Sequence, residues 1–208
     1  MAHMIPTTPP RYGPGRDAER LVYEALRGHL DDETFVYHSL KYHHAGCAGE
    51  GEIDFLVLHR EHGMLVIECK GGGVELDGHG SWWRLVGDGQ REVMKESPFD
   101  QAKRQLWQLV EVLKPRYWNA LASRKGEELP FAFGYAVAFP KTLVDDLVLP
   151  PDFDRTLVID AGDLGRVHQK LLAILAQWQA GRRRTPLSKP EFKRFRKGVL
   201  HPPLKLTD

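Results

Sequence analysis

Cysteine and net charge are both scarce in this chain of 208 residues, and long hydrophobic runs are missing. The two cysteines, Cys47 and Cys69, are too few for a disulfide framework, so we expect reduced thiols and a cytoplasmic protein. No apolar stretch approaches the ~20 residues of a membrane-spanning helix, and the N-terminus has no signal-peptide core, so we expect no membrane partner. The net charge of +1 gives no bulk attraction to nucleic acid, which would need a local basic patch.

The amino-acid composition of the chain is typical of one globular domain of ordinary size. Hydrophobic residues make up 42% and charged residues 27% of the chain, which is long enough to bury a core. We expect a lead-in over residues 1–14, a domain over residues 15–180 and a basic tail or linker over residues 181–208. The first four residues are typical of a cloning remnant, so they stay outside the predicted fold.

The stretch from Gly51 to Gly71 predicts a β-hairpin. Residues 53–58 and 64–67 are short runs rich in β-branched and large apolar side chains. Residues 60–63 between them are polar and end in a glycine suited to a positive φ. These features predict two antiparallel strands joined by a tight turn.

Pairing across this hairpin brings charged side chains together at its open end. With the turn near residues 61–62, Asp54 lies opposite Glu68 to within a residue, with Cβ atoms ~5 Å apart. Side chains alternate along a strand, so Glu68 and Lys70 share a face while Cys69 points the other way. Two carboxylates and an ammonium in an apolar hairpin are costly unless they pair or hold a cation. The pattern suits a hard divalent metal with a lysine beside it.

Two helices are predicted to flank this hairpin. The first begins near Asp17 and carries Glu19 in its first turn, where the helix dipole alone would favour an acid. The second has Ser97 as N-cap and Pro98 at its first position. Polar residues fall along one side of this second helix: Gln101, Arg104, Gln105 and Gln108. Without further context, Gln101 is a helix-surface amide.

The remaining elements complete an α/β domain with a central mixed sheet flanked by helices. Strands are predicted at residues 34–40, 74–76, 82–86, 92–95, 131–139 and 157–160. Asp163 is predicted to cap a final helix.

Three local patterns have competing interpretations. The glycines at residues 71–73 lack the helix and lysine of a P-loop, so we expect a close backbone approach or a sharp bend after Lys70. For Trp82 and Trp83 we favour packing over base stacking. Because adjacent strand residues face opposite sides, exposure of one of the two is the alternative. The histidines at residues 43–44 lack partners for a zinc site, so we favour a substrate-facing loop or a solvated surface.

The C-terminal segment changes composition and becomes basic. Between residues 182 and 197 only Glu191 opposes the cations, and Phe192 and Phe195 are interleaved with them. The cations are Arg182, Arg183, Arg184, Lys189, Lys193, Arg194, Arg196 and Lys197. A solvated tail or linker and a phosphate-contacting arm are both open interpretations.

Together these segments resemble the nuclease-related domain (NERD) family of the PD-(D/E)xK nuclease superfamily. Asp54 followed by Glu68-Cys69-Lys70 is similar to its D…ExK signature. The matching parts span roughly residues 15–140: Glu19, Glu52-Ile-Asp-Phe-Leu-Val-Leu58, Val66-Ile-Glu-Cys-Lys-Gly71, Trp82-Trp83 and Ser97-Pro-Phe-Asp-Gln-Ala102. The ordered set is more specific than the short signature.

The resemblance implies a restriction-endonuclease-like core and metal-dependent hydrolysis of phosphodiester bonds, with DNA as the expected substrate and RNA as the alternative. It implies that Asp54 and Glu68 bind Mg²⁺ or Mn²⁺, with the Cys69 carbonyl as third ligand and Glu19 completing the acidic shell directly or through water. Metal binding there would polarise the phosphoryl group and activate water.

The resemblance also assigns roles to two further residues and a context to the chain. Lys70 would position the attacking water or stabilise charge on the phosphate, and Gln101 would orient Lys70 or the substrate. Such a domain often precedes helicase or kinase-like domains, so we expect the N-terminal module of a longer DNA-processing or defence protein. The rival hypotheses are a non-catalytic nucleic-acid-binding module and an interaction module, the latter with Glu68 and Lys70 as a structural ion pair.

Overall fold

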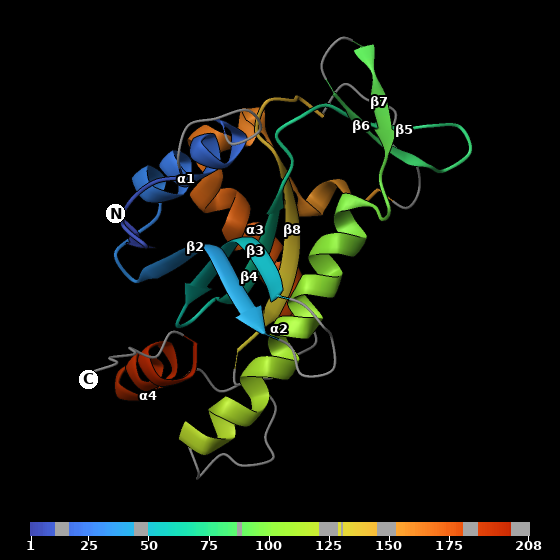
Figure 1. Cartoon of the computed structure of the whole chain (residues 1–208). Helices are drawn as coiled ribbons and strands as arrows, with labels where there is room; N and C mark the ends of the chain where they lie inside the picture. The colour runs from blue at the N-terminus through green and yellow to red at the C-terminus, as the bar shows by residue number, and fades with distance from the viewer. Residues whose placement is uncertain are drawn as a thin grey trace, which may run out of the picture.

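The computed structural model is built on a central sheet of six strands in the order β1-β2-β3-β4-β8-β9 (Figure 1). It describes residues 1–10, 17–43, 50–86, 89–120, 129, 131–144, 153–180 and 187–200. The strands are β1 (His3–Ile5), β2 (Thr34–His43), β3 (Glu50–His59), β4 (Gly63–Cys69), β8 (Phe133–Phe139) and β9 (Val158–Asp160). The sheet is mixed as predicted, since β2, β3 and β4 pair antiparallel and the other neighbours pair parallel.

Helices cover both faces of this sheet. Apolar side chains of α1 (Asp17–His29) and α3 (Val167–Gln179) form one buried cluster with one face. The second face packs against α2 (Pro98–Ala120), α4 (Lys189–Arg194) and the π-helical turn η5 (Phe195–Leu200). Every residue of β4 is buried, because β4 lies between β3 and β8 and under both helical layers. In the part of the chain that the structure describes, none of the helices is long and apolar enough to cross a bilayer.

A second, small sheet projects beside the start of α2 (Figure 1). It is the predicted antiparallel meander, formed by β5 (Val74–Leu76), β6 (Trp82–Leu85) and β7 (Arg91–Val93). The Leu85 N–H donates to the Gly73 carbonyl at 2.9 Å, and a Cβ on Gly73 would lie 2.7 Å from Leu85 Cδ1. The glycine run therefore serves a close backbone approach, as the sequence predicts.

The two adjacent tryptophans are used for packing within the described structure. Trp82 lies 6.3 Å from both Phe99 and Phe153, measured between ring centroids, and so anchors the small sheet on the domain. Trp83 donates its indole N–H to Asp77 Oδ2 at 2.8 Å. Both rings are partly buried, which agrees with the packing interpretation.

Two terminal segments differ from what the sequence led us to expect. Residues left outside the fold form β1, which pairs with β2 and buries Met4. Part of the expected tail forms α4 and η5, where Phe192 and Phe195 join the α2-side core. Apolar residues three or four positions apart give this basic segment a buried face that its cations obscure in the sequence. The domain boundaries and a phosphate-contacting role for this segment stay predictions.

One predicted cap is displaced. Asp163 does not cap α3, because a 3₁₀ helix, η4 (Ala161–Arg166), precedes it. Asp160 and Asp163 instead form a capping box at the start of η4. The predicted final strand is accordingly short, with Leu157 in the 3₁₀ turn η3 (Arg155–Leu157) before β9.

Candidate functional site

The hairpin of β3 and β4 has the predicted register. Pairing runs from His59 opposite Gly63 to Phe55 opposite Ile67, so one further step brings Asp54 level with Glu68. Gly63 has a φ of 111°, and a Cβ there would lie 2.2 Å from the Ala132 carbonyl oxygen. Only glycine satisfies both conditions, which fixes the position of the turn and therefore the register.

The regular alternation of β3 breaks at Asp54. Ile53 and Phe55 would share a face in a regular strand, yet Ile53 packs with the α2-side core and Phe55 with the α1-side core. Opposite Asp54, Ser39 has a positive φ of 50°. The Asp54 side chain turns toward β4, where its Oδ2 accepts a hydrogen bond of 2.7 Å from the Cys69 backbone N–H.

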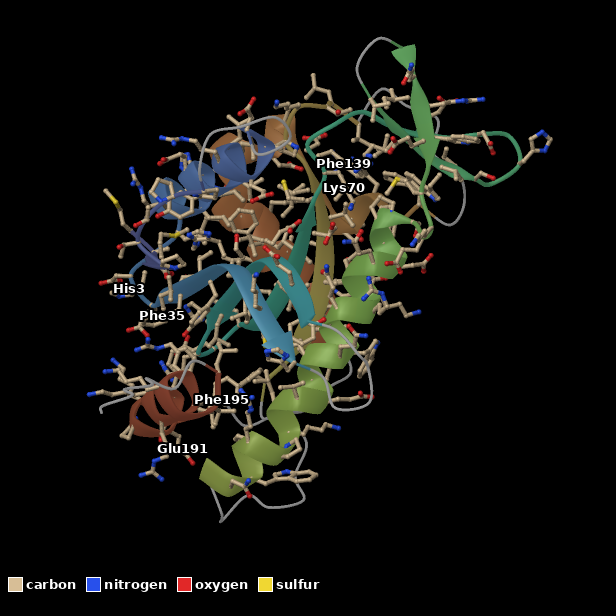
Figure 2. All side chains as sticks on the ribbon, viewed as in Figure 1. His3, Phe35, Lys70, Phe139, Glu191 and Phe195 are labelled. Carbon is tan, nitrogen blue, oxygen red and sulfur yellow. The ribbon has the colours of Figure 1, made fainter. Side chains whose placement is uncertain are left out.

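Glu68 is the centre of the site and is only 3% exposed. Its Oε1 accepts from Lys70 Nζ at 2.6 Å, and its Oε2 accepts from Gln105 Nε2 at 2.9 Å. Lys70 Nζ also donates to Gln101 Oε1 at 2.8 Å. Figure 2 shows Lys70 at the end of the central sheet, facing the start of α2. Three of the predicted site residues thus lie in one hydrogen-bonded chain.

Glu19 and Cys69 belong to the same region but act differently. The charge of Glu19 raises the pKa of both Asp54 and Cys69, so its carboxylate lies within electrostatic reach of the hairpin end. Burial raises the pKa of the Cys69 thiol well above its usual range, and the charges of Asp54, Glu19 and Glu68 add to this effect. The side chain of Cys69 is part of the buried α1-side core.

The pKa of the Asp54 carboxyl is also raised far above its usual value. Burial and the neighbouring charge of Glu68 raise its pKa to about 7, with a smaller contribution from Glu19. The Cys69 N–H and the Lys70 ammonium oppose this shift without cancelling it. The site therefore has more negative charge than its lysine neutralises, which favours binding of a cation.

The donors present fit a hard divalent metal, although they are not assembled around one. Among the described residues, no three His, Cys, Asp or Glu side chains are grouped so that they could hold a metal ion. Both carboxylate oxygens of Glu68 are hydrogen-bonded by protein groups, Oε1 by Lys70 and Oε2 by Gln105. Asp54 and Glu68 nevertheless present carboxylate oxygens, the donors that Mg²⁺ and Mn²⁺ prefer.

Sequence reasoning missed the role of Gln105. This amide is 4% exposed and bridges Glu68 to the Glu52 carbonyl, which accepts from the same Nε2 at 3.0 Å. The available signal was its spacing from Gln101, because residues four apart share a helix face. His43 ends β2, whereas residue 44 and most of the predicted loop lie outside the described residues.

Comparison with known proteins identifies one family. The family model of the nuclease-related domain (NERD) matches residues 14–140, which is more than half of the chain. The match includes all of the site residues: Glu19, Asp54, Glu68, Cys69, Lys70, Gln101 and Gln105. No curated protein and no solved structure matches the chain.

Proposed function

Because this chain belongs to the family of nuclease-related domains, we propose that it hydrolyses phosphodiester bonds of DNA with Mg²⁺ or Mn²⁺. We also propose that its core is of the PD-(D/E)xK, restriction-endonuclease-like kind. In support, a central hairpin carries Asp54 on one strand and Glu68 and Lys70 at the end of the other. The helices α1 and α2 lie on opposite faces of this hairpin, and each contributes a side chain to the region.

The observation that carries the proposal is the position of Lys70 between an acid and an amide. Its Nζ lies 2.6 Å from Glu68 and 2.8 Å from Gln101, and its side chain is still 19% exposed. An ammonium held in this way is aimed by two acceptors and remains open to a substrate. A purely structural partner of Glu68 would not need this exposure.

The site residues would divide the chemistry as follows. Asp54, Glu68 and the Cys69 carbonyl would hold the metal, with Glu19 acting directly or through water. The cation would supply polarisation of the phosphoryl group and a lower pKa for the attacking water. Lys70 would hold that water or the developing negative charge on the phosphate, and Gln101 would orient the ammonium.

The proposal is tested with the purified chain on linear, circular and single-stranded DNA and on RNA, with Mn²⁺ and with EDTA. We expect cleavage of DNA with the metal and none with EDTA. Glu68→Gln should abolish cleavage, whereas Glu61→Gln, at the exposed turn of the same hairpin, should leave it unchanged. Cleavage that survives EDTA or the Glu68 variant would contradict the proposed chemistry.

A second candidate function is a module that binds nucleic acid or a protein without catalysis. The favouring observation is that both oxygens of Glu68 are already hydrogen-bonded by protein groups, as in a structural ion pair. Metal titration separates the two, because only a working site gains stability from Mn²⁺ and cleaves. Placement within a longer DNA-processing or defence protein, and in the cytoplasm, stays a prediction.

A further inference from the structure

A cavity of about 500 Å³ lies directly beside the proposed catalytic lysine. Lys70 and Gln101 line one side of it, and the small sheet β5–β7 with the segment that follows it lines the other. The residues of this second side that carry the argument are Arg84, Val93, Met94 and Lys95. Two carboxylates also line it, Glu92 paired with Arg84 and Glu96 paired with Arg104 outside the cavity. The small sheet is therefore a wall of the space next to Lys70.

This wall has cations that are available to a ligand. Within the described ranges Lys95 has no ion-pair partner, and its side chain is exposed. Arg84 pairs with Glu92 at 2.5 Å, but the two side chains are 62% and 58% exposed. An ion pair this exposed contributes little to stability, because water screens the two charges, so a phosphate can replace the carboxylate.

The same wall is also apolar. Val74 and Met94 line the cavity, and Val93 is 64% exposed although it is a large hydrophobic residue. Cations next to apolar side chains match an unpaired nucleotide, which has a charged phosphate and an open base face. A duplex would leave the apolar wall unused, because its base faces are stacked.

The size of the cavity agrees with this occupant. Pockets for small ligands measure about 300–1,000 Å³, so the cavity accommodates roughly one or two nucleotides of a single strand. We propose that this cavity binds an unpaired nucleic-acid strand, with phosphates at Arg84 and Lys95 and a base against Val93 and Met94. The inference rests on the proposed function, which it deepens by naming the substrate form.

The test measures binding of a labelled single-stranded oligonucleotide and of the matching duplex in EDTA, over a range of salt concentrations. The parent should bind the single strand more tightly. The double variant Arg84→Ala/Lys95→Ala should bind it more weakly, and its slope of log affinity against log salt should be smaller by about 1.4, or about 0.7 per lost phosphate contact. The control double variant Arg27→Ala/Arg116→Ala removes the same charge outside the cavity and should keep the parent slope.

Each outcome decides for or against the inference. An unchanged slope in the cavity variant, or tighter binding of the duplex, overturns it, even where the parent cleaves DNA with Mn²⁺ and the proposed function stands. A parent that binds single strands through Arg84 and Lys95 but never cleaves supports the binding site and refutes the catalysis. A parent that binds no nucleic acid overturns both.

Discussion

The end of the hairpin β3–β4 and the small sheet β5–β7 line one cavity, and each carries an ion pair, one buried and one exposed. Glu68 of the hairpin is 3% exposed, whereas Arg84 and Glu92 of the small sheet are 62% and 58% exposed. Burial makes a charge costly to leave unpaired, and exposure makes a pair nearly neutral in energy. The hairpin therefore holds its charges in fixed positions, while the exposed charges of the small sheet can separate at little cost in stability.

The largest expected effect comes from Lys70→Met, which removes the ammonium that pairs with the buried Glu68. We expect cleavage to fall by at least about 100-fold, because the ammonium acts on the water or the phosphate. In EDTA the variant should lose roughly 3 kcal/mol of unfolding free energy, since Glu68 keeps only its Gln105 bond. The measurements are cleavage rate and melting temperature, with Lys103→Met on the exposed side of α2 as control.

Adding Mn²⁺ to Lys70→Met separates a catalytic metal site from a structural ion pair as the reason for the lost stability. In the nuclease, Mn²⁺ at 100 times its dissociation constant should restore about 2.7 kcal/mol of stability to Lys70→Met without restoring cleavage. If the variant stays destabilised in Mn²⁺ and the parent never cleaves, Glu68 and Lys70 are a structural ion pair.

Next in size, Gln105→Leu and Gln101→Leu should separate stability from catalysis. Gln105→Leu leaves the buried Glu68 Oε2 without this donor and also removes the bond to the Glu52 carbonyl, so we expect a loss of roughly 1–3 kcal/mol. Gln101→Leu removes an acceptor from the partly exposed Lys70 and should change stability less but cleavage more. Chemical denaturation and rate measurements on both variants provide the check. Equal effects on stability would show that the two amides play the same role.

A smaller effect is expected from pH, through Asp54. Its pKa of about 7 in the fold lies above the usual value, so the metal-free folded protein binds the proton more tightly than the unfolded chain. Stability in EDTA should therefore rise as pH falls from about 8 to about 5, by on the order of 2 kcal/mol. Asp54→Asn should flatten this dependence, measured as the denaturation midpoint against pH. In the parent, Mn²⁺ affinity should fall over the same range, because protons compete for the carboxylate.

The smallest effect is expected in the small sheet. Glu92→Ala should change the free energy of unfolding by less than about 0.5 kcal/mol, because its pair with Arg84 is exposed. A double-mutant cycle with Arg84→Ala measures the coupling directly. A coupling comparable with that of Glu68 and Lys70 would break the comparison, since it would mean that the small sheet also holds its charges in fixed positions.

Local patterns were enough to predict the hairpin and its charged end. The two apolar runs and the glycine at residue 63 predict the position of the turn, which places Asp54 opposite Glu68 to within a residue, and strand periodicity puts Lys70 on the face of Glu68. The meander and the start of α2 at Pro98 were also predicted correctly. These features succeed because turn geometry and strand periodicity depend on neighbouring residues alone.

Other features depend on contacts between distant segments, and the sequence alone could not reveal them. In the sequence, Gln105 is one of several polar residues along a predicted helix. Its role follows only from the packing of α2 on β4, which brings it to Glu68. The apolar residues of the basic C-terminal segment show their core role only against α2, where Phe195 is fully buried. Burial depends on which surfaces meet, and a local pattern does not contain that information.

The sequence by itself determined the hairpin, its register to within a residue and the residue types at its open end, because two short apolar runs around a tight turn leave little freedom in the pairing. Only the tertiary structure decided how deeply those charged side chains are buried and how far their pKa values are displaced. Packing of two helical layers buries Glu68 and raises the pKa of Asp54, while the small sheet stays exposed beside them. The difference follows from desolvation, which depends on the whole fold and not on the neighbouring residues in the chain.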